Sequence, residues 1–160
     1  MKVYLCLILF YVVSVVKAQN DTTKTLTFTG YGELYFSQDF SKVVDEEKPN
    51  FIYNHKKLGA INMNLAFIKA TYSTKRIRAN FALMAGNYAR YNLSSEPAWA
   101  RIIYEANLGL KLSKSKNIWL EGGVMPAHIG FESALGADCW TLTRSLLAEN
   151  SPYFETGIKL

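Results

Sequence analysis

The sequence predicts an all-β fold: a transmembrane, antiparallel, up-and-down β-barrel, preceded by a signal peptide, of which this chain supplies about six strands. Three observations support this prediction: repeated two-faced segments of strand, a strict alternation of long and short connections, and an apolar N-terminal leader. Known barrels of this kind have an even number of strands from about eight upward, so about six strands leave the barrel incomplete. We therefore expect residues 19–160 to form the N-terminal portion of a larger barrel; closure by self-association is the alternative.

The first 18 residues have the features of a secretory signal peptide. A basic start at Met1-Lys2 precedes an almost unbroken apolar run over residues 3–16, and Ala18 supplies the small residue before the cleavage site. The run is shorter than the roughly 17–25 residues that a membrane-spanning helix needs, which argues against an uncleaved anchor. The mature protein is therefore expected to be exported, with Cys139 as its single cysteine and no internal disulfide.

The charge of the mature chain is modest. Loss of Lys2 and Lys17 with the leader lowers the formal net charge from +5 to +3. A charge this small and dispersed gives no reason to expect a nucleic-acid partner. After Ala18 no apolar run approaches the length of a spanning helix, so insertion into a membrane would have to use β-strands.

The first strand is predicted at residues 27–36, TFTGYGELYF. Phe28, Leu34 and Phe36 fall on even positions, whereas Glu33 falls on an odd position among residues that can hydrogen-bond. This period of two is typical of a strand with one apolar and one polar face. A soluble β-protein turns the apolar face toward a core, whereas a membrane barrel turns it toward lipid and turns the polar face toward a wet lumen.

Five further segments repeat the two-faced pattern. Most are about 9–11 residues long, the length of a tilted membrane-spanning strand, whereas soluble strands more often have about 5–6 residues. Regular alternation along them places Leu65, Phe67 and Tyr104 on the apolar side. The segments are residues 59–71, 76–88, 102–112, 117–126 and 153–160.

The connections between these segments alternate strictly between long and short. Residues 73–75 and 113–116 are very short connections, and the three others are long. Outer-membrane barrels have short periplasmic turns at one end and long outer loops at the other, whereas a soluble meander has no reason to alternate. The long connections are residues 37–58, 89–101 and 127–152.

Polar and charged side chains occupy mid-strand positions opposite the apolar rows. In a small soluble barrel or sandwich, that side would simply face bulk water. Six strands with long apolar faces and no covering helix instead favour lipid on the apolar side and a lumen on the polar side. The predicted lumen-facing residues are Glu33, Asn62, Asn64, Arg78, Asn80, Glu105, Asn107, Lys111 and Glu121.

The longest connection contains a segment with helical composition, TLTRSLLAE at residues 141–149, with Asp138 or Thr141 as a candidate N-cap. We hypothesise that this segment folds inward and narrows the lumen, because charged groups that face each other across a pore determine which solutes pass. A surface cap with solvated charges is the alternative. The predicted constriction residues are Asp138, Arg144 and Glu149. The wall residues that they would meet are Arg78, Glu105 and Lys111.

Nothing in the sequence predicts catalysis, a cofactor or a metal site. His128 lies near Glu132 and Asp138 along the chain, but no second histidine or cysteine stands at ligand spacing. His128 and Ser133 lack the nucleophile elbow or other catalytic motif that would make them a catalytic pair. We therefore expect that the protein is not an enzyme and has no catalytic, cofactor-binding or metal-binding residues.

Five stretches that span most of the mature chain carry a family resemblance: FIYNHKK (51–57), RIRANFALMAGNYA (76–89), IYEANLGLKLSK (103–114), IWLEGGVMPAHIGFESALG (118–136) and CWTLTRSLLAENSPYFETGIKL (139–160). These stretches are similar to the OmpL-like family of outer-membrane β-barrel porins. The resemblance implies a barrel, suggests passive diffusion and implies no catalytic residues. Members of that family are considerably longer and have more strands, which is consistent with an incomplete barrel here.

Together these observations predict an outer-membrane pore for the passive diffusion of small hydrophilic solutes. A water-filled lumen lowers the cost of moving a polar solute past hydrocarbon, and wall charges bias which solutes enter. The expected partners are outer-membrane lipids, the barrel-assembly machinery and the solutes. Two alternatives stay open: a secreted, soluble, lipocalin-like ligand-binding barrel, and a non-conducting outer-membrane receptor or structural barrel.

Overall fold

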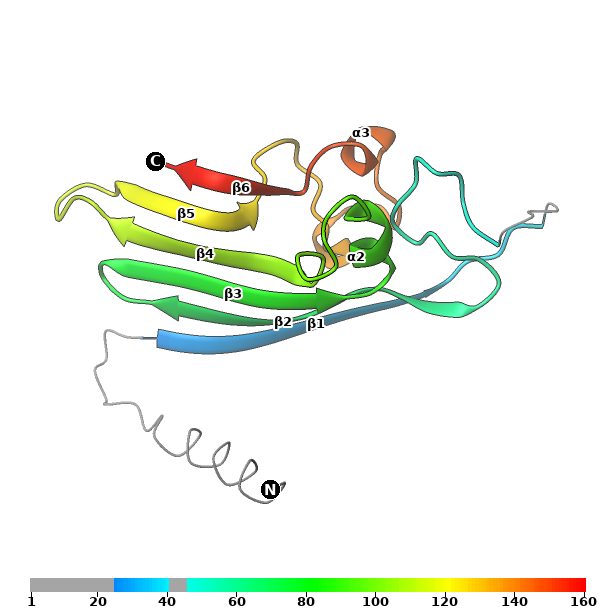
Figure 1. Ribbon diagram of the computed structural model, residues 1–160, viewed down its shortest axis with the longest axis horizontal. Helices are drawn as coiled ribbons and strands as arrows, with labels where there is room; N and C mark the ends of the chain where they lie inside the picture. The colour runs from blue at the N-terminus through cyan, green and yellow to red at the C-terminus, as the bar shows by residue number, and fades with distance from the viewer. Residues whose placement is uncertain (1–24, 41–45) are drawn as a thin grey trace, which may run out of the picture.

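The computed structural model of the protein describes residues 25–40 and 46–160 (Figure 1). The predicted signal peptide, residues 1–18, lies outside the described residues and stays a prediction, as does the start of the mature chain at residue 19.

Six strands form one antiparallel sheet in which neighbours in the sequence are neighbours in space. This confirms the predicted all-β, up-and-down arrangement. The sheet is open, because within the described residues no strand pairs with the outer edge of the first or the last strand (Figure 1). This is the arrangement expected of part of a barrel. The strands are β1 (Thr25–Phe36), β2 (Ile61–Ser73), β3 (Ile77–Ala85), β4 (Ile103–Lys111), β5 (Trp119–Pro126) and β6 (Phe154–Lys159).

The connections alternate in length as predicted, with the long ones at one end of the sheet and the two short turns at the other (Figure 1). Hydroxyl groups hold the short turns. Thr74 Oγ1 accepts a hydrogen bond from the backbone N–H of Ile77 at 2.9 Å, and Ser113 Oγ accepts one from that of Lys116 at 3.0 Å. We call residues 37–60, 86–102 and 127–153 the first, second and third connections.

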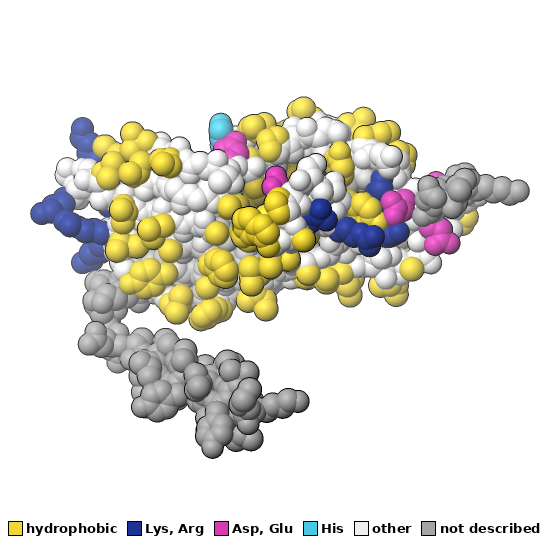
Figure 2. Space-filling model, viewed as in Figure 1, with side chains coloured by type: hydrophobic (Ala, Val, Ile, Leu, Met, Phe, Trp, Pro, Cys, Tyr) yellow, Lys and Arg dark blue, Asp and Glu magenta, His cyan; other side chains and the backbone are white. Residues whose placement is uncertain are grey.

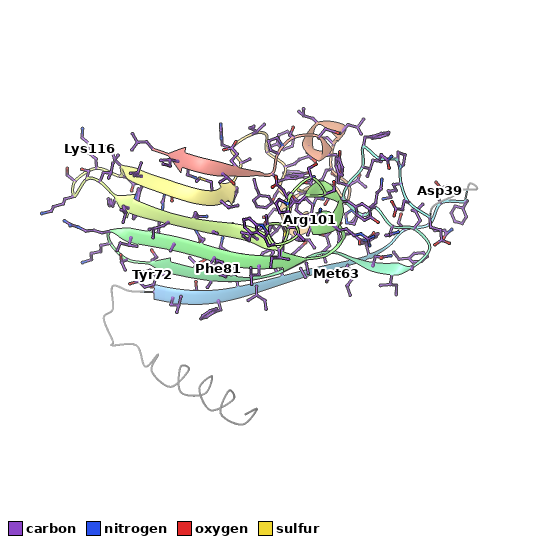
Figure 3. All side chains as sticks on the ribbon, in the orientation of Figure 1. Asp39, Met63, Tyr72, Phe81, Arg101 and Lys116 are labelled. Carbon is purple, nitrogen blue, oxygen red and sulfur yellow. The ribbon has the colours of Figure 1, made fainter. Side chains whose placement is uncertain are left out.

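One face of the sheet exposes its apolar side chains, and we call it the bare face. Phe28 is 70% exposed, Ile68 is 72% exposed and Ile158 is 80% exposed. The register explains why side chains from different strands share this face. Phe28 pairs with Ala70, which lies two residues after Ile68 on β2, and Ala70 in turn pairs with Phe81 on β3. Figure 2 shows hydrophobic side chains over the strands, and Figure 3 labels Met63, Tyr72 and Phe81 of β2 and β3. The apolar row of the opening strand is confirmed as an exposed row.

The opposite face, which we call the covered face, carries Glu33, Lys69, Arg78, Glu105 and Glu121, and the connections cover its end near Glu33, Lys69 and Glu105. In two strands, β2 and β4, the residues on this face differ from those that regular alternation predicts. The cause in both strands is a β-bulge, at which the register skips one residue.

The first difference lies in β2, where Leu65 and Phe67 were expected on the apolar side and are instead on the covered face. Glu33 pairs with Leu65 and the next residue, Leu34, pairs with Met63, so the register skips Asn64. This bulge turns Asn64 and Leu65 inward together, and each is 0% exposed. From Leu65 onward the alternation is inverted.

The second difference is at Tyr104 in β4, which was expected on the apolar side. Ala82 pairs with Glu105 and Leu83 pairs with Ile103, so the register skips Tyr104. Tyr104 is 5% exposed and lies on the covered face beside Glu105. Each bulge therefore transfers an apolar side chain from the bare face into a core.

That core lies on the covered face near the long connections. Phe67 stacks on Tyr104 with 4.6 Å between ring centroids and on Tyr31 with 5.6 Å. The second and third connections supply the other half of the core, and burial raises the pKa of the Tyr88 hydroxyl far above its usual range. The buried core consists of Leu65, Ala82, Met84, Tyr88, Ala89, Tyr104, Ala134 and Tyr153.

Gly86 ends β3 and starts α2 (Asn87–Asn92), a helix that the sequence pattern did not predict. Its φ of 125° is in the region that glycine favours, and a Cβ there would overlap the backbone carbonyl of Asn64. The apparent continuation of the strand pattern to residue 88 was therefore wrong. No helix in the described part of the chain is long and apolar enough to cross a membrane.

The helix expected over residues 141–149 is shorter than predicted. The structure has α3 at Leu146–Glu149, and its N-cap is Ser145, whose Oγ accepts from the N–H of Ala148 at 3.2 Å. The Thr141 hydroxyl donates to the carbonyl oxygen of Thr143 at 2.6 Å. Such local side-chain bonds offer the backbone an alternative to the helix, which explains its late start.

Gly123 and Gly122 form an adjacent pair that tests the packing of the sheet. Gly123 has a φ of 124°, and a Cβ there would overlap the carbonyl oxygen of Ala106 on β4. Gly123→Ala should destabilise the barrel that contains this sheet by roughly 1–3 kcal/mol, measured by denaturant unfolding in detergent. Gly122→Ala is the control, because the nearest atom to its Cβ, on Ile158, would be 3.6 Å away. Equal effects of the two substitutions would contradict the assigned geometry.

Candidate functional site

The covered face is the candidate functional site, and the strand register arranges its side chains in three rows that run across the sheet. The row nearest the short turns we call row 1, and the others follow toward the long connections. Row 1 contains Ser73, Arg78, Gly109, Glu121 and Lys159. Row 2 contains Thr71, Asn80, Asn107 and Gly123. Row 3 contains Lys69, Ala82 and Glu105.

Row 1 is a cluster of charges centred on Glu121. Arg78 Nε donates to Oε1 of this carboxylate, and Lys159 Nζ lies 3.1 Å from its Oε2. Gly109 lies between Arg78 and Glu121 in the register, and a Cβ there would stand 2.8 Å from Cγ of Arg78. The absence of a side chain at this position therefore lets partners from β3 and β5 meet.

Row 2 is uncharged and hydrogen-bonded along its length. Thr71 Oγ1 donates to Asn80 Oδ1 at 3.1 Å, and Asn80 Nδ2 donates to Asn107 Oδ1 at 2.9 Å. Asn107 Nδ2 continues the chain to the carbonyl oxygen of Val124 at 3.0 Å. The amides thus orient one another and hold four strands together by side-chain contacts.

Row 3 repeats the design of row 1 with a different ion pair. Lys69 Nζ lies 2.8 Å from Glu105 Oε2, and the small, fully buried Ala82 separates them in the register. Sequence reasoning missed Lys69, because regular alternation from Ile61 put it on the lipid side. A lysine at the middle of a lipid-facing row costs about 2–4 kcal/mol, so its presence was a signal that β2 changes phase.

Lys111 and Trp119 extend the covered face beyond row 1, toward the short turns. They pair directly in the β4–β5 register, and the Lys111 Nζ lies 5.9 Å from the centroid of the indole ring. The guanidinium carbon of Arg78 lies 4.4 Å from the same ring. The indole therefore packs against two cations at this end of the face.

At the other end, Glu33 anchors the first connection. His55 Nε2 lies 2.6 Å from Glu33 Oε1, and the His55 ring is almost fully buried against Tyr35. Asn64 Oδ1 accepts from the His55 N–H at 2.9 Å. Glu33 and Asn64 therefore fix a loop in place, whereas Asn62 lies farther out and donates to the carbonyl oxygen of Ala60 at 3.1 Å.

The third connection crosses the covered face from β5 to the far side of the sheet. A Cβ on Gly136 would lie 2.8 Å from Glu33 Oε1, so the backbone here touches β1. Between this connection and the wall lies a cavity of about 390 Å³. Its lining includes the charged residues Lys69, Glu105, Glu132 and Asp138 and the aromatic residues Phe67 and Tyr104.

The three predicted constriction residues have different environments. Asp138 is exposed and lines the cavity together with Glu105. Arg144 is buried and donates to the carbonyl oxygens of Ser133 at 2.8 Å and Ala134 at 3.2 Å. The structure brings Asp138 to the wall, whereas Arg144 binds the backbone of its own connection.

Glu149 joins the third connection to the first. Its Oε2 accepts from the N–H groups of Tyr53 at 2.7 Å and Asn54 at 3.1 Å, and its Oε1 accepts from Asn54 Nδ2 at 3.0 Å. This carboxylate is 3% exposed and contacts none of the predicted wall charges Arg78 and Lys111.

A second contact joins the first connection to α2. Glu47 Oε1 lies 2.6 Å from Lys57 Nζ and accepts from the Tyr91 hydroxyl at 2.7 Å. These two hydrogen bonds hold the pKa of the Glu47 carboxyl below its ordinary value. In the third connection, hydrogen bonds from Ser145 likewise lower the pKa of Glu132.

The fold and the charged covered face define a segment of β-barrel wall. The family described as "Putative beta-barrel porin-2, OmpL-like" matches residues 25–160, which covers every strand of the sheet. The chain therefore belongs to this OmpL-like β-barrel porin family, as the sequence resemblance indicated. No curated protein and no solved structure shows significant similarity to the chain.

Glu149 should be necessary for the position of the third connection. Glu149→Gln removes the charged acceptor and leaves at least one buried N–H of the first connection with a weaker partner. Hydrogen exchange and limited proteolysis should then show faster opening of residues 127–153 and 46–58, by about tenfold. Glu96→Gln, a change in an exposed side chain, is the control; unchanged protection in Glu149→Gln would contradict the assigned role.

The Glu47 contact should weaken in acid. Because its folded-state pKa is lowered, the contact contributes stability above the unfolded-state pKa, and this is lost as the pH falls through the folded-state value. Protection of α2 against hydrogen exchange, corrected for intrinsic rates, should decrease as the pH is lowered below 4.5, the ordinary pKa of a glutamate carboxyl. Glu47→Gln should show low protection at every pH; an unaltered pH profile in this variant would refute the prediction.

Proposed function

We propose that this chain forms part of the wall of an outer-membrane pore that lets small hydrophilic solutes diffuse passively. The observation that carries the proposal is that, over six consecutive strands, one face of the sheet exposes apolar side chains and the other carries polar and charged ones. Large apolar side chains such as Phe28 and Ile158 are exposed on the bare face, while ion pairs such as Lys69–Glu105 lie on the covered face. This polarity suits lipid outside and water inside.

The same polarity argues against the soluble, lipocalin-like alternative. A soluble barrel of that kind would place its apolar rows around a ligand cavity and its charges outside. Here the ion pairs and amides lie on the face that carries the third connection at one end, and the apolar rows of the opposite face are uncovered in the described residues. A porin family is also a non-enzymatic class, which supports transport without bond chemistry.

One observation favours a second candidate, a non-conducting barrel with a receptor or structural role. Near the long connections, Tyr88, Ala134 and Tyr153 pack onto the covered face and fill part of the space that a lumen would occupy. The two candidates differ in conductance, because a barrel plugged by its connections passes no ions.

The experiment has two steps. The full-length protein should fractionate with the outer membrane and change its gel mobility on boiling, as a closed barrel does. Reconstituted in a planar bilayer, it should form steady, voltage-tolerant channels. A soluble protein would overturn the proposal, and a folded membrane barrel without conductance would establish the non-conducting alternative.

The third connection provides a sharper prediction. Replacing residues 129–143 by a short Gly-Ser linker removes the segment that crosses the covered face and should raise single-channel conductance about twofold. The Glu149 anchor is retained in this variant, so the first connection keeps its contact. Replacing residues 94–98 of the second connection is the control. A conductance equal to that of the unaltered protein would show that the third connection does not narrow the pore.

A further inference from the structure

Charge is distributed unevenly between the two ends of the sheet. The half next to the short turns comprises residues 25–30, 71–80, 107–121 and 157–160, and it has a net charge of +6 against +5 for the entire chain. The rest of the chain is therefore net negative. Figure 2 shows Lys and Arg side chains at this end without Asp or Glu beside them, whereas basic and acidic side chains lie together at the other end. The basic side chains in this half are Lys75, Arg76, Arg78, Lys111, Lys114, Lys116 and Lys159, and the single carboxylate is that of Glu121.

On the covered face, cations outnumber the carboxylate that could neutralise them. Arg78 and Lys159 share Glu121, so this cluster has an excess of one positive charge. Lys111 packs on the Trp119 ring, and within the described residues no carboxylate lies within ion-pair distance of it. The wall near the short turns therefore has a net charge of about +2 at neutral pH.

Exposure increases this imbalance, because in each ion pair of the wall the cation is the more exposed partner. The side chain of Arg78 is 40% exposed and that of Lys159 is 55% exposed, against 11% for Glu121. The Lys69 side chain is 23% exposed and its partner Glu105 is 6% exposed. The carboxylates lie against the sheet, and the ammonium and guanidinium groups extend toward the open side.

We propose that this half of the covered face makes the pore selective for anions, and that its solutes are small hydrophilic anions carrying carboxylate or phosphate groups. The inference rests on the proposed pore. A positive wall in a narrow aqueous space raises the local concentration of anions and lowers that of cations. Arg78 and the two lysines also supply the charged donors that carboxylate and phosphate oxygens accept from.

The test is the zero-current potential of the full-length protein in a planar bilayer under a KCl gradient. The permeability ratio of chloride to potassium should exceed one, and phosphate or a small dicarboxylate should reduce the chloride current by competition. The double variant Lys111→Gln/Lys159→Gln removes two positive charges and leaves the Arg78–Glu121 pair intact. It should lower the permeability ratio by about two- to fivefold.

The matched control is Lys114→Gln/Lys116→Gln, which removes the same charge from the exposed turn between β4 and β5 and should change the ratio less. Heat-modifiability confirms that each variant folds, and single Lys111→Gln provides a milder test if the double variant does not. Conducting channels that prefer potassium, or equal effects of the wall and turn variants, would overturn the anion proposal alone. A folded barrel that does not conduct would instead overturn the pore on which it rests.

Discussion

The structure depends on one constraint: an antiparallel ladder that continues unbroken through six strands while side chains alternate between its faces. Because each strand is hydrogen-bonded to its sequence neighbour, the face on which one residue lies determines the face of its partner on the next strand. Phe28, Ala70, Phe81 and Ala106 are joined in this way across four strands. The bare face and the rows of the covered face both follow from this register.

The sequence was sufficient to predict the number of strands, their antiparallel order and the alternation of connection lengths, because these depend on local periodicity and on turn residues. It could not predict the bulges at Asn64 and Tyr104, since skipping one residue leaves the composition of a strand unchanged. The resulting inversion hid Lys69, a central residue of row 3. Its only trace in the sequence was a charge in an apparently lipid-facing row. The roles of Arg144 and Glu149 were equally inaccessible, because their partners are backbone groups brought together only by the fold.

Rows 1 and 3 show how the sheet accommodates charge. Partners two strands apart have backbones about 9–10 Å from each other, which is too far for short side chains to meet over a bulky neighbour. In both rows the middle strand supplies a small residue, Gly109 between Arg78 and Glu121, and Ala82 between Lys69 and Glu105. Each carboxylate can then lie flat against the wall, and its basic partner extends over the small residue toward the open side. The small residues thus allow each pair to form, and in both pairs the basic side chain is the more exposed partner.

The two ends of the covered face consequently serve different purposes. Near the long connections, charged side chains such as those of Glu33, Arg144 and Glu149 bind groups of the connections and hold them in place. Aromatic rings fill the space between the connections and the sheet. The position of the third connection is therefore determined by backbone groups and by the core, without help from the basic wall near the short turns. Because that wall is not needed to hold a loop, Lys111 contacts the Trp119 ring and Lys159 shares Glu121 with Arg78, which is the arrangement that the proposed anion selectivity requires.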